Sequence, residues 1–192
     1  MNKKKTWENL ENKFRMMGDR LGRPLDGGIF ETVVALNALQ IATTSSCEGH
    51  LDHGLAAPWV DIHTVKDDAF YKLVEDAKAL QNKAIDLIKT GQNTKGGQLM
   101  KKNQLLLLKL KKPNLILADR LSRLLEEFYL MREVPYSRRL IITSLGYGVR
   151  LKSQGEILQE LKNKKVKDEK LKEYQLEMLD FTTFLKEKFF IE

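Results

Sequence analysis

The sequence predicts an α+β protein in which five or six helices pack with a small sheet of three or four strands. Apolar residues recur at spacings of three and four over most of the chain, which is the pattern of helices with one buried face. Short β-branched or aromatic runs interrupt this pattern and predict strands. Because helices outnumber strands and do not alternate with them regularly, a doubly wound parallel sheet is not expected.

Size and composition predict one domain. The 192 residues, 42% hydrophobic and 31% charged, suffice for one core over residues 1–192, with residues 156–192 as a helical C-terminal extension. A single cysteine excludes an internal disulfide, and no apolar segment typical of a secretory signal follows the N-terminus. The longest apolar runs are far below the roughly 18 residues of a membrane span. We therefore expect a cytoplasmic protein without a membrane partner.

The N-terminal part predicts two helices and a strand. A helix over residues 6–20 has Thr6 as its N-cap and one apolar face, made by Trp7, Leu10, Phe14 and Met17. Glycines and a proline over residues 22–28 predict a loop. The next helix, from Ile29 to Leu39, is apolar over much of its circumference, which predicts burial against a sheet. It leads to a first strand, Ile41 to Thr44.

The middle part predicts a strand and three helices. Trp59 to His63 forms the strand, and a helix opens at residues 67–68 and stops at Gly91. Residues 92–98 are polar and predict a flexible hinge. The next helix, residues 98–111, is predicted to break at Pro113. Asn114 is predicted to cap a further helix, which ends near Glu133.

The C-terminal part predicts two strands and a helical tail. Arg139 to Leu145 forms a third strand, residues 146–148 form a glycine break, and residues 149–151 form a short fourth strand. Residues 156–189 follow as helix, with a break expected between Asn163 and Asp168.

A polar window between the first two strands is the predicted site. Residues 41–65 hold the only cysteine and all three histidines, together with several acids: Cys47, Glu48, His50, Asp52, Asp61, His53 and His63. These are the side chains able to act as nucleophile, as acid or base near neutral pH, or as soft metal ligand. Rigid strand ends commonly present such groups on a loop. We expect Cys47 to His53 to lie at the sheet edge.

Three chemistries remain open for this window. A metal ion can be bound by His50, Asp52, His53 and His63, with Cys47 or Glu48 as further donors. Catalysis has His50, Glu48 and Cys47 as candidates, with His50 as the base for a Cys47 nucleophile. A polar or anionic ligand can instead bind to main-chain and hydroxyl groups, for which the candidates are Thr44, Ser45, Ser46, Gly49 and His63.

The positive charge is unevenly distributed along the chain. Residues 1–66 hold 8 basic and 8 acidic side chains, residues 67–98 hold 5 of each, and residues 99–192 hold 20 and 13. The excess can contact a polyanion or simply form solvated helix faces. The candidates for nucleic-acid contact are Arg138, Arg139, Arg150, Lys162, Lys164 and Lys165.

The segment Thr43-Thr44-Ser45-Ser46-Cys47 resembles the TTSSCSGR motif of the wybutosine-synthesis tRNA methyltransferases, which methylate a modified guanosine beside the anticodon with S-adenosylmethionine. The similarity covers about residues 7–50, and the SCEGH form of the motif is also similar to that of uncharacterised bacterial and phage proteins. The resemblance implies that Ser45, Ser46, Cys47 and Gly49 line a binding loop, with S-adenosylmethionine as the cofactor. Glu48 and His50 depart from the motif, which has serine and arginine there.

These observations lead to a hypothesis with two alternatives. The protein is expected to bind a nucleotide-like or nucleic-acid ligand, such as RNA, at the loop from Ser45 to His63. In the first alternative it is a non-enzymatic interaction or regulatory protein that binds a partner protein through its C-terminal helices. In the second it is a metal-dependent enzyme that uses the His/Asp/Cys cluster.

Overall fold

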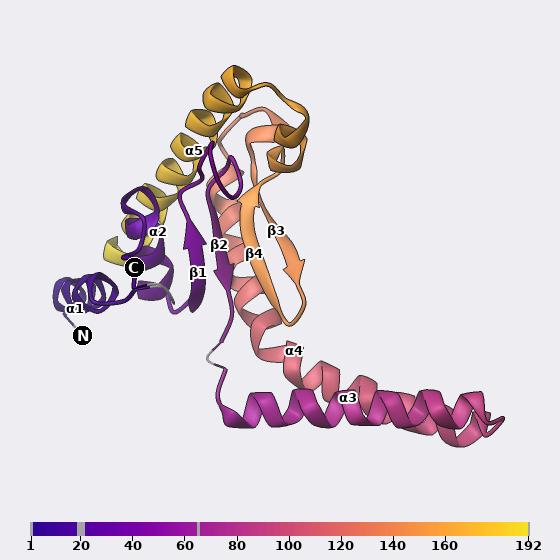
Figure 1. Ribbon diagram of the computed structural model, residues 1–192. Coiled ribbons are helices and arrows are strands. Elements are labelled where there is room, and N and C mark those ends of the chain that lie inside the picture. The colour runs from indigo at the N-terminus through magenta and orange to yellow at the C-terminus, as the bar shows by residue number, and fades with distance from the viewer. Residues whose placement is uncertain (1, 19–21, 65, 192) are drawn as a thin grey trace. The chain divides into compact units, whose positions relative to one another are not determined.

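The computed structural model describes residues 2–18, 22–64 and 66–191 and confirms the predicted α+β class (Figure 1). Helices and a four-stranded sheet make up the described chain. In order they are α1 (Lys3–Arg15), α2 (Gly27–Ala38), β1 (Thr43–Cys47), β2 (Trp59–Ile62), α3 (Asp68–Lys89), α4 (Asn93–Tyr129), the 3-10 helix η1 (Tyr136–Arg138), β3 (Leu140–Leu145), β4 (Gly148–Ser153), the 3-10 helix η2 (Glu156–Leu161) and α5 (Lys164–Ile191).

The chain divides into two compact units, where the sequence predicts one domain. Met1–His63 and Leu117–Glu192 form the first, here called the sheet unit, and Thr64–Ile116 forms the second, the hairpin unit. The boundary falls inside α4, whose first part belongs to the hairpin unit and whose last part belongs to the sheet unit. No helix in the described part of the chain is long and apolar enough to cross a membrane.

The sheet is antiparallel throughout, with strand order β1-β2-β4-β3. One cross-strand row runs Ser45, Asp61, Arg150 and Thr143, so polar side chains gather on the outer face. The alternate positions are mainly apolar and form the inner face; Val60, Ile62, Leu140 and Leu151 are nearly or wholly buried there, as is Ser153. As predicted, Ile41 to Thr44 and Trp59 to His63 contribute to neighbouring strands.

Helices α2, α5 and the last part of α4 cover the inner face. The core includes Ile29 and Leu36 of α2, Leu121 of α4, and Phe181 of α5. The predicted C-terminal helix is confirmed, and its apolar side lies in this core. A break at residues 162–163 precedes this helix. Residue 163 lies inside the range expected for the break, and residue 162 lies directly before that range. The hydroxyls of Thr32 and Thr182 share a buried hydrogen bond of 2.7 Å between α2 and α5.

Helix α1 is shorter and starts earlier than predicted. The side chain of Asn2, rather than that of Thr6, accepts the capping bond, from the amide of Lys5 at 3.2 Å. Trp7 and Phe14 are buried as expected, but Met17 lies beyond the helix and is 50% exposed. The predicted end of this helix includes residues 19–21, which lie outside the described residues.

In the hairpin unit, α3 is confirmed and the predicted hinge is wrong. The side chain of Asp67 caps α3 by accepting the amide of Phe70 at 2.8 Å. Residues 93–98, expected as a loop, are the first turns of α4. A Cβ on Gly96 would lie 2.5 Å from the Ile88 side chain and 3.0 Å from the Ala84 carbonyl. Gly96 therefore permits α3 and α4 to pack closely, although the polar composition of residues 92–98 predicts a loop.

Pro113 does not end a helix, because α4 continues through it. Buried apolar side chains on both sides of the proline, including Leu110 and Leu117, outweigh its low helix propensity. Asn114, predicted as an N-cap, is 1% exposed, and its side chain accepts the amide of Thr64 at 2.7 Å.

Strand β1 is also shifted from the prediction. It begins at Thr43 and includes Ser45, Ser46 and Cys47, which were expected in the loop. The pairing with β2 has a bulge between Thr43 and Ser45. The polar loop is therefore shorter than predicted and begins at Glu48.

Candidate functional site

The site is built where β1 ends and α2 begins. Asp26 occupies the N-cap position of α2, and its carboxylate accepts the backbone amide of Glu48 at 3.1 Å. In return, the Glu48 carboxylate accepts the amide of Gly28, in the first turn of α2, at 2.7 Å. An N-terminal helix turn attracts anions through its free amides and its dipole. The Glu48 carboxylate already serves as the anion at this helix start, so its hydrogen bond to the Gly28 amide gives Glu48 a structural role.

Gly49 shapes the turn that follows. Its φ of +87° is unfavourable for other residues, and an added Cβ would lie 2.7 Å from both the Ala57 carbonyl carbon and a Leu171 side-chain carbon. The Gly49 amide donates to the Cys47 sulfur at 3.4 Å, and the His50 amide donates to the Leu55 carbonyl at 3.0 Å. The turn thus brings His50 back beside β1.

Two groups of potential metal ligands result. Asp26, Cys47 and His50 form the first, and His50, Asp52 and His53 form the second; within each group the donor atoms lie within 4.8 Å of one another. The first group is half-buried, whereas Asp52 and His53 are exposed. The His50 Nε2 atom is 3.5 Å from Asp26 Oδ2, and the His53 Nδ1 atom is 2.8 Å from Asp52 Oδ1.

The cysteine in this site is a weaker acid than usual. Burial raises the pKa of the Cys47 thiol most strongly, and the nearby Asp26 carboxylate raises it further, although the Gly49 amide bond acts in the opposite direction. A thiol with a raised pKa is largely protonated near neutral pH, and the thiolate is the nucleophile. This environment disfavours Cys47 as the nucleophile of the covalent catalysis considered from the sequence.

His63 does not join either group. It lies directly after β2 and is 6% exposed, and its amide donates to the Ala42 carbonyl at 3.1 Å. Ala42 precedes β1 whereas Cys47 ends it, which separates the two places by roughly 15 Å along the strand. A Cβ on Gly148 would lie 2.8 Å from the His63 ring, so this histidine is closely packed. Within the described residues His63 therefore belongs to neither group of potential metal ligands, and its place in a ligand site stays a prediction.

The hydroxyl candidates lie along β1. Thr44 and Ser45 are exposed, whereas Ser46 is half-buried. The Ser46 hydroxyl oxygen is buried and has no hydrogen-bond partner within the described residues. Because these residues form an edge strand, one side of their backbone pairs with β2 and is not available to a ligand.

Arg150 is held on the outer sheet face. Its guanidinium donates to both carboxylate oxygens of Asp61, at 2.6 and 3.0 Å, and lies 3.8 Å from the centre of the Trp59 ring. Bidentate pairing and stacking fix the side chain and neutralise its charge locally. Arg150 is therefore a poorer candidate for phosphate contact than its sequence position suggests.

The other nucleic-acid candidates fall into two classes. Arg138 pairs at 2.8 Å with Glu177, whose side chain is wholly buried, and the Arg139 guanidinium lies 5.3 Å from the Tyr129 ring centre. In contrast, the lysines are exposed around the start of α5: Lys162, Lys164 and Lys165. These three remain open to a partner, whereas the arginines contribute to the sheet unit itself.

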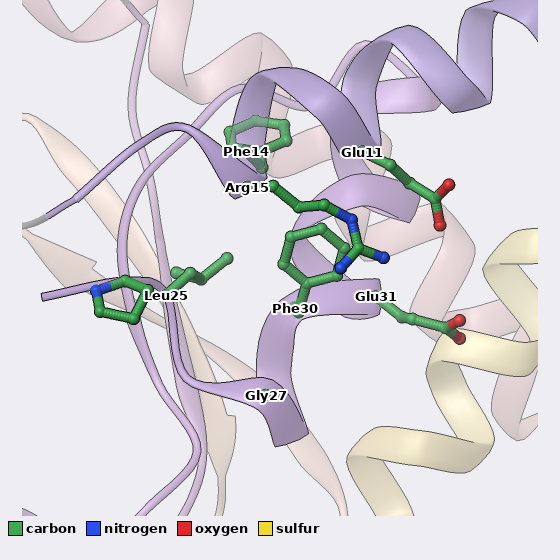
Figure 2. A pocket seen from close by; sticks show the side chains of 8 residues that line it. Glu11, Phe14, Arg15, Leu25, Gly27, Phe30 and Glu31 are labelled. Carbon is green, nitrogen blue, oxygen red and sulfur yellow. The ribbon is translucent and has the colours of Figure 1, made fainter.

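A pocket of about 520 Å³ lies between α1, α2 and the loop before α2. Figure 2 shows the Arg15 side chain across the Phe30 ring, with Glu11 and Glu31 on the same side. The Arg15 guanidinium is 5.0 Å from the Phe30 ring centre. None of the site residues predicted from the sequence lines this pocket, although Gly27 directly follows Asp26.

The unit boundary changes the interpretation of the net charge. The hairpin unit has 11 lysines and 5 acids, and the sheet unit has 22 basic and 21 acidic residues, so the hairpin holds +6 of the +7. Between Leu87 and Ala118 the sequence has no acid and seven lysines, all exposed: Lys89, Lys95, Lys101, Lys102, Lys109, Lys111 and Lys112. Residue 98 lies inside this acid-free run, so charges counted separately over residues 67–98 and 99–192 do not reveal it.

Sequence reasoning also missed Asp26, because no local pattern links it to a cysteine 21 residues later in the chain. The comparisons give no further guide: no protein-family model, curated protein or solved structure matches the chain significantly.

Proposed function

We propose that the protein binds nucleic acid, with RNA as the first class to test, through the lysines of the hairpin unit. The observation that carries the proposal is the segregation of charge: a net +6 on the hairpin unit against +1 on the sheet unit. Phosphate neutralisation by lysine and arginine supplies most of sequence-independent nucleic-acid binding. A surface rich in one sign of charge also accelerates the approach of a polyanion.

The lysines of α4 are arranged to contact a phosphate chain. Lys102, Lys109 and Lys112 follow at spacings of seven and three, so they lie on one side of the helix and span about 15 Å along its axis. All three are exposed, and among the described residues no carboxylate forms an ion pair with them. Their charges are available to a ligand at low cost in desolvation.

This proposal moves the nucleic-acid contact away from the loop expected from the sequence. There, Glu48 supplies a carboxylate to the start of α2, and a phosphate at the same amides would meet that negative charge. The resemblance to the wybutosine-synthesis methyltransferases supports tRNA as the first probe. S-adenosylmethionine is proposed on that resemblance alone and can be tested by calorimetry on the same preparation.

A second candidate function, binding of a partner protein, is favoured by apolar side chains on the same helix. Leu105 and Leu108 of α4 are 63% and 55% exposed and lie on the side that also carries Lys112. Phosphate contact does not require such leucines. A protein with an acidic, partly apolar surface would contact both kinds of side chain.

The experiment compares two triple variants of equal charge change. In the first, Lys102, Lys109 and Lys112 become glutamine, and in the control Lys162, Lys164 and Lys165 become glutamine. Fluorescence anisotropy with labelled tRNA is measured over a range of salt concentrations. We expect the hairpin variant to bind at least about tenfold more weakly, with a salt slope reduced by about two to three, since each phosphate contact contributes about 0.7–0.9.

The outcomes distinguish the candidates. A loss confined to the Lys162 variant assigns the contact to the sheet unit and contradicts the proposal, as does no binding of tRNA or single-stranded DNA at low salt. A further double variant, Leu105→Ser with Leu108→Ser, tests the partner-protein alternative. If this variant loses tRNA binding as strongly as the lysine variant, apolar contact rather than phosphate contact governs the surface.

A further inference from the structure

Three side chains of different ligand chemistry converge where α2 begins and β1 ends. A carboxylate oxygen of Asp26, the Cys47 sulfur and an imidazole nitrogen of His50 lie within 4.8 Å of one another, and all three residues are half-buried. We propose that they bind one divalent transition-metal ion of the zinc class. Three protein donors leave one position of a tetrahedral ion for water or a substrate atom, as in catalytic zinc sites.

The distances suit a tetrahedral ion. Bonds of about 2.0–2.3 Å from zinc to nitrogen, oxygen and sulfur place neighbouring donor atoms roughly 3.3–3.7 Å apart. The His50 Nε2 and Asp26 Oδ2 atoms are 3.5 Å apart, so this pair already has the required spacing. The sulfur needs at most about 1 Å of approach, which rotation of the Cys47 side chain can supply.

The backbone prearranges two of the donors. Cys47 and His50 are separated by two residues, a spacing at which both can reach one ion from a single turn. The Gly49 amide donates to the Cys47 sulfur, and the amide of Glu48 donates to the Asp26 carboxylate. Outer hydrogen bonds of this kind orient metal ligands and raise the affinity.

The donor set indicates the class of metal. Binding of the ion displaces the proton of the Cys47 thiol to solvent, and the resulting thiolate and the Asp26 carboxylate carry two negative charges, which a divalent ion balances inside a half-buried site. Thiolate and imidazole donors favour zinc, cobalt or copper over magnesium and calcium, which prefer oxygen. The chemistry that such an ion supplies is the activation of a bound water or the polarisation of a carbonyl or phosphoryl oxygen.

His53 is excluded from the proposed ligand set by its orientation. Its ring stacks on that of His50, with centres 4.2 Å apart and planes inclined by 16°. Stacked rings direct their in-plane nitrogen lone pairs side by side and not toward one point. The exposed His53 already has Asp52 as a partner at 2.8 Å, so it serves as the matched control for His50.

The test uses reduced, tag-free protein and cobalt(II) as a spectroscopic substitute for zinc. Tetrahedral cobalt with a thiolate ligand gives visible bands together with a sulfur-to-metal charge-transfer band in the near ultraviolet. We expect both, with saturation at one ion per chain and displacement by zinc. Cys47→Ser should abolish the charge-transfer band, and His50→Ala and Asp26→Asn should each weaken zinc binding by at least about a hundredfold, beyond the effect of losing an outer hydrogen bond.

The control separates this site from its neighbour. His53→Ala should retain the cobalt spectrum and keep zinc affinity within about threefold of the unmodified protein. The absence of a charge-transfer band in the unmodified protein, or a greater loss with His53→Ala than with Cys47→Ser, contradicts the proposal. Circular dichroism of each variant distinguishes lost ligands from lost folding. Because the three donors lie in the sheet unit, either result leaves the nucleic-acid proposal for the hairpin unit unaffected.

Discussion

Two paired arginines of the sheet unit and the α4 lysines of the hairpin unit lie in different environments. In the sheet unit, buried or half-buried charges pair across elements: Arg138 with Glu177 and Arg150 with Asp61. In the hairpin unit, the lysines of α4 are exposed on a stretch that contains no acid. Paired charges fix the positions of strands and helices, whereas exposed charges of one sign remain available to a partner. The difference separates charges that maintain the fold from charges that can recognise a ligand.

Removal of Glu177 should have the largest effect on stability. Its wholly buried carboxylate pairs with Arg138 and accepts the Tyr129 hydroxyl at 3.0 Å, so Glu177→Ala removes the acceptor of that hydroxyl and the nearer of the two carboxylates beside Arg138. We expect a loss of about 3–5 kcal/mol in the free energy of unfolding, measured by urea denaturation. The control, Asp168→Ala, removes an exposed pair with Lys172 and should cost less than about 1 kcal/mol. Similar losses for the two variants would show that burial of the pair does not matter.

Gly49→Ala should have the next largest effect, because it imposes both an unfavourable backbone angle and a close contact. The φ of +87° and the 2.7 Å approach to Ala57 and Leu171 predict a loss of about 2–3 kcal/mol. Gly54 has a φ of +69° but open space around it, so Gly54→Ala should cost only about 1–2 kcal/mol. Thermal and urea denaturation measure the difference. Equal losses of stability for the two variants would mean that Ala57 and Leu171 move away from the added methyl group at no cost in free energy.

Two neighbouring glycines test the packing of the hairpin unit and should give effects of opposite sign. A Cβ on Gly96 meets the Ile88 side chain and the Ala84 carbonyl, so Gly96→Ala should destabilise the protein by about 1–3 kcal/mol. Gly97 has nothing within 4 Å, so Gly97→Ala should add about 0.5–1 kcal/mol through helix propensity. Stabilisation by both changes would indicate that α3 and α4 do not pack closely at this point.

The lysine variant of the hairpin unit should have the smallest effect on stability. Replacement of Lys102, Lys109 and Lys112 by glutamine removes exposed charges that form no ion pair among the described residues, so stability should change by less than about 0.5 kcal/mol. Urea denaturation measures this value on the variant used for RNA binding. A loss above 1 kcal/mol would place these lysines among the charges that maintain the fold and would remove the contrast between the two units.

Local patterns predicted much of the fold. The start of α3 follows from Asp67 as a capping residue, and its end follows from Gly91. β-branched and aromatic runs identified the region of all four strands. The continuity of α4 was not predictable from local rules, because Gly96 and Pro113 are usually breakers and only the packing on both sides keeps the helix intact.

The site was only partly predictable for a different reason. Cys47 and His50 share one turn, so their spacing in the sequence indicated that they lie together. Asp26 enters from another element, and Asp61 pairs with an arginine 89 residues away. Such contacts depend on tertiary structure and leave no local signal. The acid-free run is present in the sequence, but its assignment to one unit depends on the boundary between Ile116 and Leu117, which no local pattern marks.

Lysine footprinting tests the contrast between the units most directly. The protein is acetylated briefly with and without saturating tRNA at low salt, and the modification of each lysine is measured by mass spectrometry. The account predicts at least about threefold protection of Lys102, Lys109 and Lys112, lost as salt rises and phosphate contacts are released, with Lys162, Lys164 and Lys165 unprotected. Protection of the second set with full reactivity of the first would contradict the assignment of nucleic-acid binding to the hairpin unit.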